Sequence, residues 1–173
     1  MELERTIEHD WFGEKLVRPF RASFAVQDER AAFHAVMPYA PPVADLHRRG
    51  DFVEGLWNDD VIELFVRDHS GRYVEFNVSA DGAWWFMPFT DYRTRAQDGC
   101  NPPETAISIV REDLQWQVRL SFDIDHLLMF LSGVNLIHFS AIHYQGGAPV
   151  YLSSRRVLGG DPDFHVASCF CPV

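Results

Sequence analysis

The feature that most constrains this chain is a pair of alternating apolar runs, VIELFV (61–66) and YVEFNVS (73–79), joined by a segment that contains Gly71. Successive side chains on a β-strand point to opposite faces, so each run has one apolar face. A three-residue loop that ends at Gly71 pairs Glu63 with Asn77 and places every aliphatic side chain on one face. A loop of even length would bury Glu63 among aliphatic side chains without a partner, which is costly, so the pattern selects the first register.

Short runs rich in Val, Ile, Phe, Tyr and Trp, separated by Gly, Asp, Asn and Pro, recur along the whole chain, a pattern typical of all-β proteins. One segment, 123–133, has a helical pattern, with Asp123 as its cap and Gly133 as its stop. We therefore expect residues 1–173 to form a single all-β domain, an antiparallel, jelly-roll-like β-sandwich of two sheets with at most one short helix. The predicted strands are 19–27, 31–38, 60–67, 72–79, 83–89, 105–111, 114–123, 135–145, 148–154 and 164–171.

The segment 105–122 forms a second predicted hairpin, with Val118 on its apolar face and Arg119 on its polar face. Two long segments, 40–55 and 90–104, have the composition of loops. Long loops in a compact domain are often functional, so both are candidates for contributing to a site.

The sequence GAWWFMPF places two tryptophans side by side on one predicted strand, so Trp84 and Trp85 must point to opposite faces. If Asp81 and Gly82 form a two-residue turn, Trp84 joins the polar face and Trp85 enters the core. A three-residue loop that also includes Ala80 exchanges the two indoles. Asp-Gly is the stronger turn signal, so we predict that Trp84 lies outside.

The composition limits the partners and the compartment. The net charge is −10 and Lys15 is the single lysine, so we expect neither a nucleic acid nor an anionic membrane as partner, because both require clustered cations. No apolar segment approaches the roughly 20 residues of a membrane span, and the acidic N-terminus shows no secretory signal. An odd number of cysteines (Cys100, Cys169 and Cys171) is typical of reduced thiols, so we expect a cytoplasmic protein.

The segment EGLWNDDVIELFVRDHSGRYVEFNVSADGAWWFMPF (54–89) resembles the core of the DOMON-like domains and the family 9 carbohydrate-binding modules. The segment GDPDFHVASCF (160–170) resembles the closing strand of small stand-alone bacterial members. The resemblance implies a β-sandwich that binds its ligand on a sheet or at the edge of the sandwich. The matching positions within 54–89 are Asp60, Glu63, Tyr73, Phe76, Ser79, Gly82 and Trp84.

In the sugar-binding members of that family, tryptophans clamp a sugar ring while a Glu and neighbouring polar residues bond its hydroxyls. A sugar presents apolar C–H faces that stack on aromatic rings and hydroxyls that need fixed partners, so a site needs both kinds of side chain. We predict a non-catalytic module for a small polar ligand, with a carbohydrate as the expected ligand and Trp57 or Trp84 as the platform. The predicted ligand-binding residues are Trp57, Glu63, Glu75, Asn77, Ser79, Trp84, Arg93 and Arg119.

Two alternatives involve chemistry beyond sugar binding. Some DOMON members bind haem through Met and His, and Met87, His138 and His143 are the residues that this alternative would use. Glu63 and Glu75 lie on neighbouring strands and could act as the carboxylate pair of a sugar-active enzyme. The structural interpretation of that pair is that an arginine such as Arg93 or Arg119 holds Glu75, and it is favoured because strand geometry alone makes such pairs common.

A structural calcium ion is the remaining cofactor to consider. Asp59 and Asp60 are adjacent carboxylates at the start of a predicted strand, and carboxylate oxygens are the ligands that Ca²⁺ prefers. Paired acids at a strand start are more often simply solvated, so the sequence leaves the metal undecided.

Overall fold

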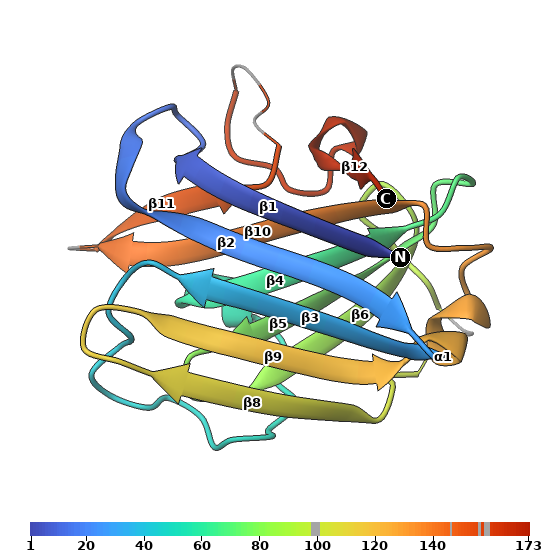
Figure 1. Cartoon of the computed structure of the whole chain (residues 1–173), viewed down its shortest axis with the longest axis horizontal. Helices are drawn as coiled ribbons and strands as arrows, with labels where there is room; N and C mark the ends of the chain where they lie inside the picture. Colours follow the sequence, from blue (N-terminus) through green and yellow to red (C-terminus); the bar gives the residue numbers. More distant parts are fainter. Residues whose placement is uncertain (98–100, 146, 156, 158–159) are drawn as a thin grey trace.

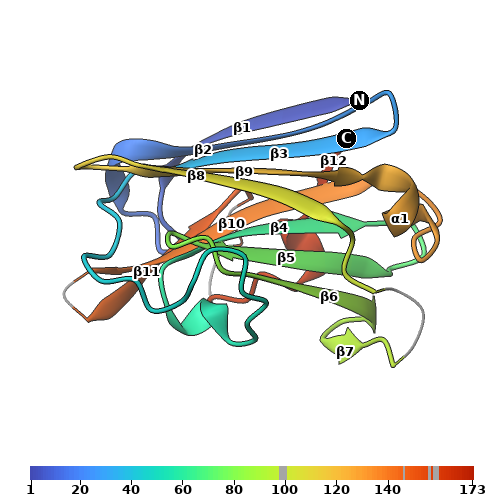
Figure 2. The same cartoon turned by 90° about the horizontal axis from the view of Figure 1, so that it is seen from below.

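A computed structural model of the chain describes residues 1–97, 101–145, 147–155, 157 and 160–173. Two antiparallel sheets lie face to face, which confirms the predicted all-β sandwich (Figure 1; Figure 2 shows the layers from the side). One sheet contains, in spatial order, β1 (Glu2–His9), β2 (Lys15–Gln27), β3 (Arg30–Met37), β9 (Trp116–Asp123) and β8 (Thr105–Arg111). The other contains β11 (Ala148–Ser153), β10 (Leu136–Gln145), β4 (Val61–Arg67), β5 (Tyr73–Ser79), β6 (Trp84–Asp91) and β7 (Thr94–Arg95), with β12 (Cys171–Pro172) paired to β10.

Helix is scarce, as the sequence predicts. The single α-helix among the described residues is α1 (Ile124–Leu128), and the Asp123 side chain caps it by accepting a hydrogen bond from the backbone N–H of Asp125. Two short 3₁₀ helices, η1 (Leu56–Asn58) and η2 (Ala167–Cys169), lie in connecting segments. Within the described residues, no helix has both the length and the apolar character that crossing a membrane requires.

The main core lies between the two sheets. Phe33 of β3 stacks on Phe139 of β10 with ring centroids 5.7 Å apart, and Phe76 of β5 stacks on Phe122 of β9 at 4.8 Å. These aromatic pairs join the two apolar faces, as expected for a sandwich in which each sheet contributes one dry face.

A second apolar cluster covers the opposite face of the β4–β5–β6 sheet. Phe65 and Trp85 of that face pack with Phe164 and Phe170 from the C-terminal segment, and Leu56 of η1 joins the same cluster. We call residues 160–173 the C-terminal cover. The C-terminal cover and η1 therefore pack over the sheet face that the sequence predicts to be polar.

The register of β4 and β5 is the predicted one. Glu63 pairs with Asn77 and Leu64 with Phe76, and Gly71 adopts a left-handed φ of 100° in the connecting loop. The predicted hairpin of β8 and β9 is also confirmed, with Ile109 opposite Val118.

The predicted turn before the two tryptophans is wrong. Val78 pairs with Trp84 and Asn77 with Trp85, so the loop has three residues and Trp85, not Trp84, shares the face of Asn77. The Asp81 carboxylate explains the choice: it accepts hydrogen bonds from the backbone N–H groups of Leu46 and His47 at 3.0 and 2.9 Å. A two-residue turn would shift the register of β6 by one residue and lose these hydrogen bonds between Asp81 and the 40–55 loop.

The chain ends differ most from the sequence prediction. Strand β1 was not expected, because its eight residues contain only Leu3 and Ile7 as apolar anchors and otherwise carry polar side chains, as exposed edge strands often do. The strand predicted at 164–171 is wrong. In this segment the side chains of Phe164 and Phe170 pack onto the sheet, while the backbone makes hydrogen bonds within the segment. Among the described residues of the C-terminal cover, only β12 pairs with a strand of the sheet.

Candidate functional site

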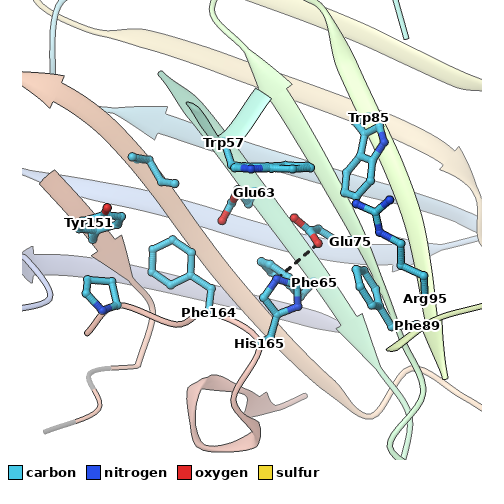
Figure 3. A pocket seen from close by; sticks show the side chains of 12 residues that line it. Trp57, Glu63, Phe65, Glu75, Trp85, Phe89, Arg95, Tyr151, Phe164 and His165 are labelled. Carbon is cyan, nitrogen blue, oxygen red and sulfur yellow. Dashed lines mark ion pairs between the residues drawn. The ribbon is translucent and has the colours of Figure 1, made fainter. Parts of the chain in front are cut away.

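A pocket of about 170 Å³ lies between the β4–β5–β6 sheet and the C-terminal cover (Figure 3). A cavity of about 150 Å³ is large enough to hold benzene, so this pocket has room for one six-membered ring. Strands β4 to β6 supply its floor, η1 and β6 one wall, and the cover the opposite wall. Its lining consists of Trp57, Glu63, Phe65, Glu75, Trp85, Phe89, Arg95, Ile142, Tyr151, Pro162, Phe164 and His165.

Two glutamates form the polar part of the floor. Glu63 is 3% exposed and Glu75 4%, and each carboxyl group is held by one neighbour. The Ser140 hydroxyl donates to Oε2 of Glu63 at 2.7 Å, and Nδ2 of Asn77 donates to Oε1 of Glu75 at 2.9 Å. Glu63 of β4 pairs with Asn77 of β5, and Glu75 lies two residues from Asn77 on the same strand. Because side chains alternate along a strand, both carboxyls point to this face.

The other oxygen of each carboxyl faces the pocket. Among the described residues, Oε1 of Glu63 has no hydrogen-bond partner, although it is not sealed from solvent. Oε2 of Glu75 has His165 as its nearest partner, at 3.8 Å from Nε2, which is too long for a hydrogen bond. In Figure 3 both carboxyl groups point into the space between Trp57, Phe164 and His165.

Burial controls the electrostatics of the floor. Loss of hydration raises the pKa of Glu63 to about 7, and loss of hydration together with the charge of Glu63 raises the pKa of Glu75 to about 8. The pair therefore retains protons near neutral pH. Its carboxyls can act as hydrogen-bond donors as well as acceptors, which suits a ligand with hydroxyl groups.

Aromatic rings form the walls. Trp57 and Trp85 meet edge to face with ring centroids 5.1 Å apart. The guanidinium of Arg95 lies 5.4 Å from the Trp85 ring, and its Nη2 atom lies 2.6 Å from Oε1 of Glu54 at the rim. This combination of apolar ring faces above buried polar groups is the usual composition of a small-molecule site.

A hydrogen-bond network fixes the C-terminal cover on the sheet. The Tyr73 hydroxyl lies 2.8 Å from Nδ1 of His165 and accepts a hydrogen bond from the backbone N–H of Arg93 at 3.1 Å. Asp163 accepts from the Tyr92 hydroxyl at 2.5 Å and from Nη2 of Arg93 at 3.0 Å. Burial lowers the pKa of His165 to about 4, so its imidazole is neutral at physiological pH.

The structure brings together only some of the residues predicted from the sequence. Trp57, Glu63 and Glu75 line the pocket, and the fully buried Asn77 lies directly behind Glu75. Arg93 is not among the lining residues, and it pairs with Asp163 rather than with Glu75.

The remaining three predicted residues lie elsewhere. The Ser79 hydroxyl is bonded within its own turn, to Asp81 and to the Ala83 carbonyl. Trp84 packs edge to face on Phe52 at 5.1 Å, on the face of β6 opposite Trp85. Arg119 is exposed on the outer face of the five-stranded sheet, opposite His34 in the ladder.

Several lining residues were not foreseen. A two-residue turn places Trp85 in the core, so the sequence pattern does not select it as a lining residue. Arg95, Tyr151, Phe164 and His165 come from segments far apart in the chain, and no local spacing connects them. One sequence feature could have indicated the C-terminal wall of the pocket. The segment GDPDFHVASCF mixes polar and aromatic residues without the alternation of an amphipathic strand or the polarity of a solvated loop.

The residues considered for haem and calcium have other partners. Nδ1 of the buried His138 lies 2.9 Å from the Ser154 hydroxyl, and Nδ1 of His143 lies 2.7 Å from Oδ2 of Asp60. Asp60 also accepts from the backbone N–H of Tyr144 at 2.9 Å. Across the parts of the chain that the structure covers, no group of three or more His, Cys, Asp or Glu residues could hold a metal ion, and Cys100 lies outside the described residues.

Fold and pocket together define a class: a two-sheet antiparallel β-sandwich with a small, aromatic-walled pocket on the outer face of one sheet. A crystal structure named "putative carbohydrate-binding protein" from Bacteroides uniformis has a similar fold, with a TM-score of 0.69. The two chains are 14% identical, and the match covers 97% of this chain and 84% of that one. At this identity the likeness establishes the shared fold alone. No protein-family model and no curated protein matches the chain.

Proposed function

We propose that the protein is a DOMON-like, non-catalytic binding module whose pocket holds one ring of a small carbohydrate. The observation that carries the proposal is the pair of buried carboxyls, Glu63 and Glu75, each with one oxygen fixed by a neighbour and the other open to a ring-sized pocket. In this arrangement the open oxygens bond sugar hydroxyls, and the walls of Trp57 and Trp85 stack on the C–H faces.

The supporting residues have defined positions in this proposal. Asn77 holds Glu75 from behind, and Arg93 fixes the C-terminal cover through Asp163. The Bacteroides protein with the similar fold bears a carbohydrate-binding name, which agrees with the proposed ligand class. Ser79, Trp84 and Arg119 lie outside the pocket and take no part in it.

Isothermal titration calorimetry with a panel of monosaccharides tests the proposal. Wild-type protein is expected to bind at least one of them, and Trp57→Ala should weaken that binding at least tenfold. Arg119→Ala, an exposed change on the other sheet, is the control and should leave affinity unchanged. No binding to any monosaccharide, or equal binding by Trp57→Ala, would contradict the proposal.

The same sugars distinguish binding from catalysis. A binding module releases each sugar unchanged, whereas an enzyme that uses Glu63 and Glu75 would convert a substrate and lose turnover in Glu75→Gln while retaining affinity. Product analysis by chromatography after prolonged incubation separates the two results. Conversion by the wild type that disappears in Glu75→Gln would replace the proposed function with a sugar-active enzyme.

A further inference from the structure

The cations near the pocket are already paired with other groups. Arg93 has Asp163 as its partner at 3.0 Å, and Arg95 has Glu54 at 2.6 Å. His165 lies 3.8 Å from Glu75, but burial keeps its imidazole neutral. Among the described residues, no cation pairs directly with Glu63 or Glu75. The two carboxyls on the floor of the pocket can therefore be neutralised by bound protons or by a cationic ligand.

The walls are also suited to a positive charge. Trp57 and Trp85 close one side of the pocket edge to face, and Phe65 and Phe164 complete its lining. The face of an aromatic ring is electronegative and attracts an ammonium group within about 6 Å of its centre. Aromatic rings around buried carboxyls resemble the arrangement by which proteins recognise amines.

A neutral sugar leaves the two carboxyls dependent on bound protons for their neutralisation, and an acidic sugar would meet two carboxyls in a desolvated site. An ammonium group instead presents three donors to the two open oxygens, Oε1 of Glu63 and Oε2 of Glu75, and allows both carboxyls to ionise. Each such charge-assisted hydrogen bond is stronger than its neutral equivalent.

We infer that the preferred ligand is an amino sugar, whose ammonium group lies on the Glu63–Glu75 floor while its ring stacks between the aromatic walls. The inference rests on the proposed function and narrows its ligand class. Neither arginine among the predicted ligand-binding residues is available to bind an anionic group of a ligand, because Arg93 is bound to Asp163 and Arg119 is remote.

Proton release is the specific sign of this binding mode. Burial raises the pKa values of both glutamates, so the free pair holds protons that a bound ammonium would displace. A neutral sugar displaces none. The other charged or titratable groups around the pair are Glu54, Tyr73, Arg93, Arg95, His138, Tyr151, Asp163 and His165.

Calorimetry with glucosamine and glucose tests the inference, slightly below neutral pH, where the amine is protonated. Titrations in two buffers of different ionisation enthalpy give the number of protons released. We expect glucosamine to bind at least tenfold more tightly than glucose and to release protons. The double variant Glu63→Gln with Glu75→Gln should lose both the preference and the proton release. Glu8→Gln, an exposed carboxyl on β1, should retain them.

The outcomes separate the inference from the function on which it rests. Equal or tighter binding of glucose overturns the amino-sugar inference and leaves the carbohydrate pocket standing. Binding of tetramethylammonium without binding of either sugar contradicts the proposed function and the amino-sugar inference together, while retaining a cation site. If the double variant fails to fold, the wild-type preference and proton count still decide the matter.

Discussion

Asn77 and Trp85 are partners across β5 and β6, and this pairing places the Trp85 indole on the same sheet face as the Glu75 carboxyl. A shift of one residue would have turned Trp85 into the inter-sheet core and left Trp84 beside the pocket. The three-residue loop before β6, held by Asp81, therefore decides which tryptophan can meet a ligand.

The first prediction separates the tryptophans. Trp57 and Trp84 are both half-buried, but only Trp57 lines the pocket. We expect Trp57→Ala to weaken sugar binding at least tenfold and Trp84→Ala to change it less than twofold, as measured by calorimetry. Comparable losses in the two variants would mean that the indoles act through stability alone.

The second prediction concerns the stability of the fold between about pH 4.5 and 8. The pKa values of Glu63 and Glu75 lie above the ordinary glutamate value, so the folded state binds more protons than the unfolded state between about pH 4.5 and 8. The contribution of these groups to the free energy of unfolding must then fall as the pH rises through that window, by up to a few kcal/mol. Denaturant unfolding at a series of pH values measures it.

Burial of His138 has the opposite effect on the free energy of unfolding at acid pH. Burial lowers the pKa of His138 to about 3, so stability rises with pH from about 3 to 6.5. We expect the free energy of unfolding to be highest between about pH 4.5 and 6.5, where the contributions of the glutamates and of His138 oppose each other. The double variant Glu63→Gln with Glu75→Gln should lose the fall in stability between about pH 4.5 and 8, so that its optimum moves to about pH 6.5 or above. An unchanged fall would show that these carboxyls are not the buried acids responsible.

The third prediction concerns the loop that sets the tryptophan register. Gly82 has a φ of 88°, and a Cβ there would lie 3.1 Å from Cγ of Arg49. We expect Gly82→Ala to lower the free energy of unfolding by about 1–2 kcal/mol, because left-handed backbone is unfavourable for alanine. Gly82→Asn is the matched control and should cost less, since Asn tolerates this conformation. Chemical denaturation with an unchanged m-value compares them.

The fourth prediction concerns the C-terminal cover. Asp163→Ala removes the acceptor for Tyr92 and Arg93 and should loosen the wall that Phe164 and His165 contribute. Ligand affinity is expected to fall several-fold, equivalent to about 1 kcal/mol. Asp161→Ala changes an exposed carboxyl in the same segment and should leave affinity unchanged. Equal affinity of both variants with the wild type would remove the cover from the binding site.

The sequence predicts the sandwich well because its evidence is local. Alternation in the β4 and β5 runs and the cost of burying Glu63 among aliphatic side chains determine the register of that hairpin, and the structure agrees. The Trp84 prediction failed for a non-local reason. The Asp81 carboxylate bonds backbone N–H groups in the 40–55 loop, and no turn preference at Asp81 and Gly82 reports that contact.

The candidate site is only half visible in the sequence. Glu63, Glu75 and Trp57 could be selected because they lie within one recognisable stretch of chain. The opposite wall requires knowing that Phe164 and His165 fold across the outer sheet face, where their side chains rather than their backbone make the contacts. Alternation can identify a strand, but it carries no information about such a cover.

The most direct test of the account is an NMR titration that follows the five tryptophan indole N–H signals as a monosaccharide is added. We expect the signals of Trp57 and Trp85, which line the pocket, to shift with ligand concentration, while those of Trp84 and the fully buried Trp116 stay in place. Saturable binding with no shift at Trp57 or Trp85, or with shifts centred on Trp84, would contradict it.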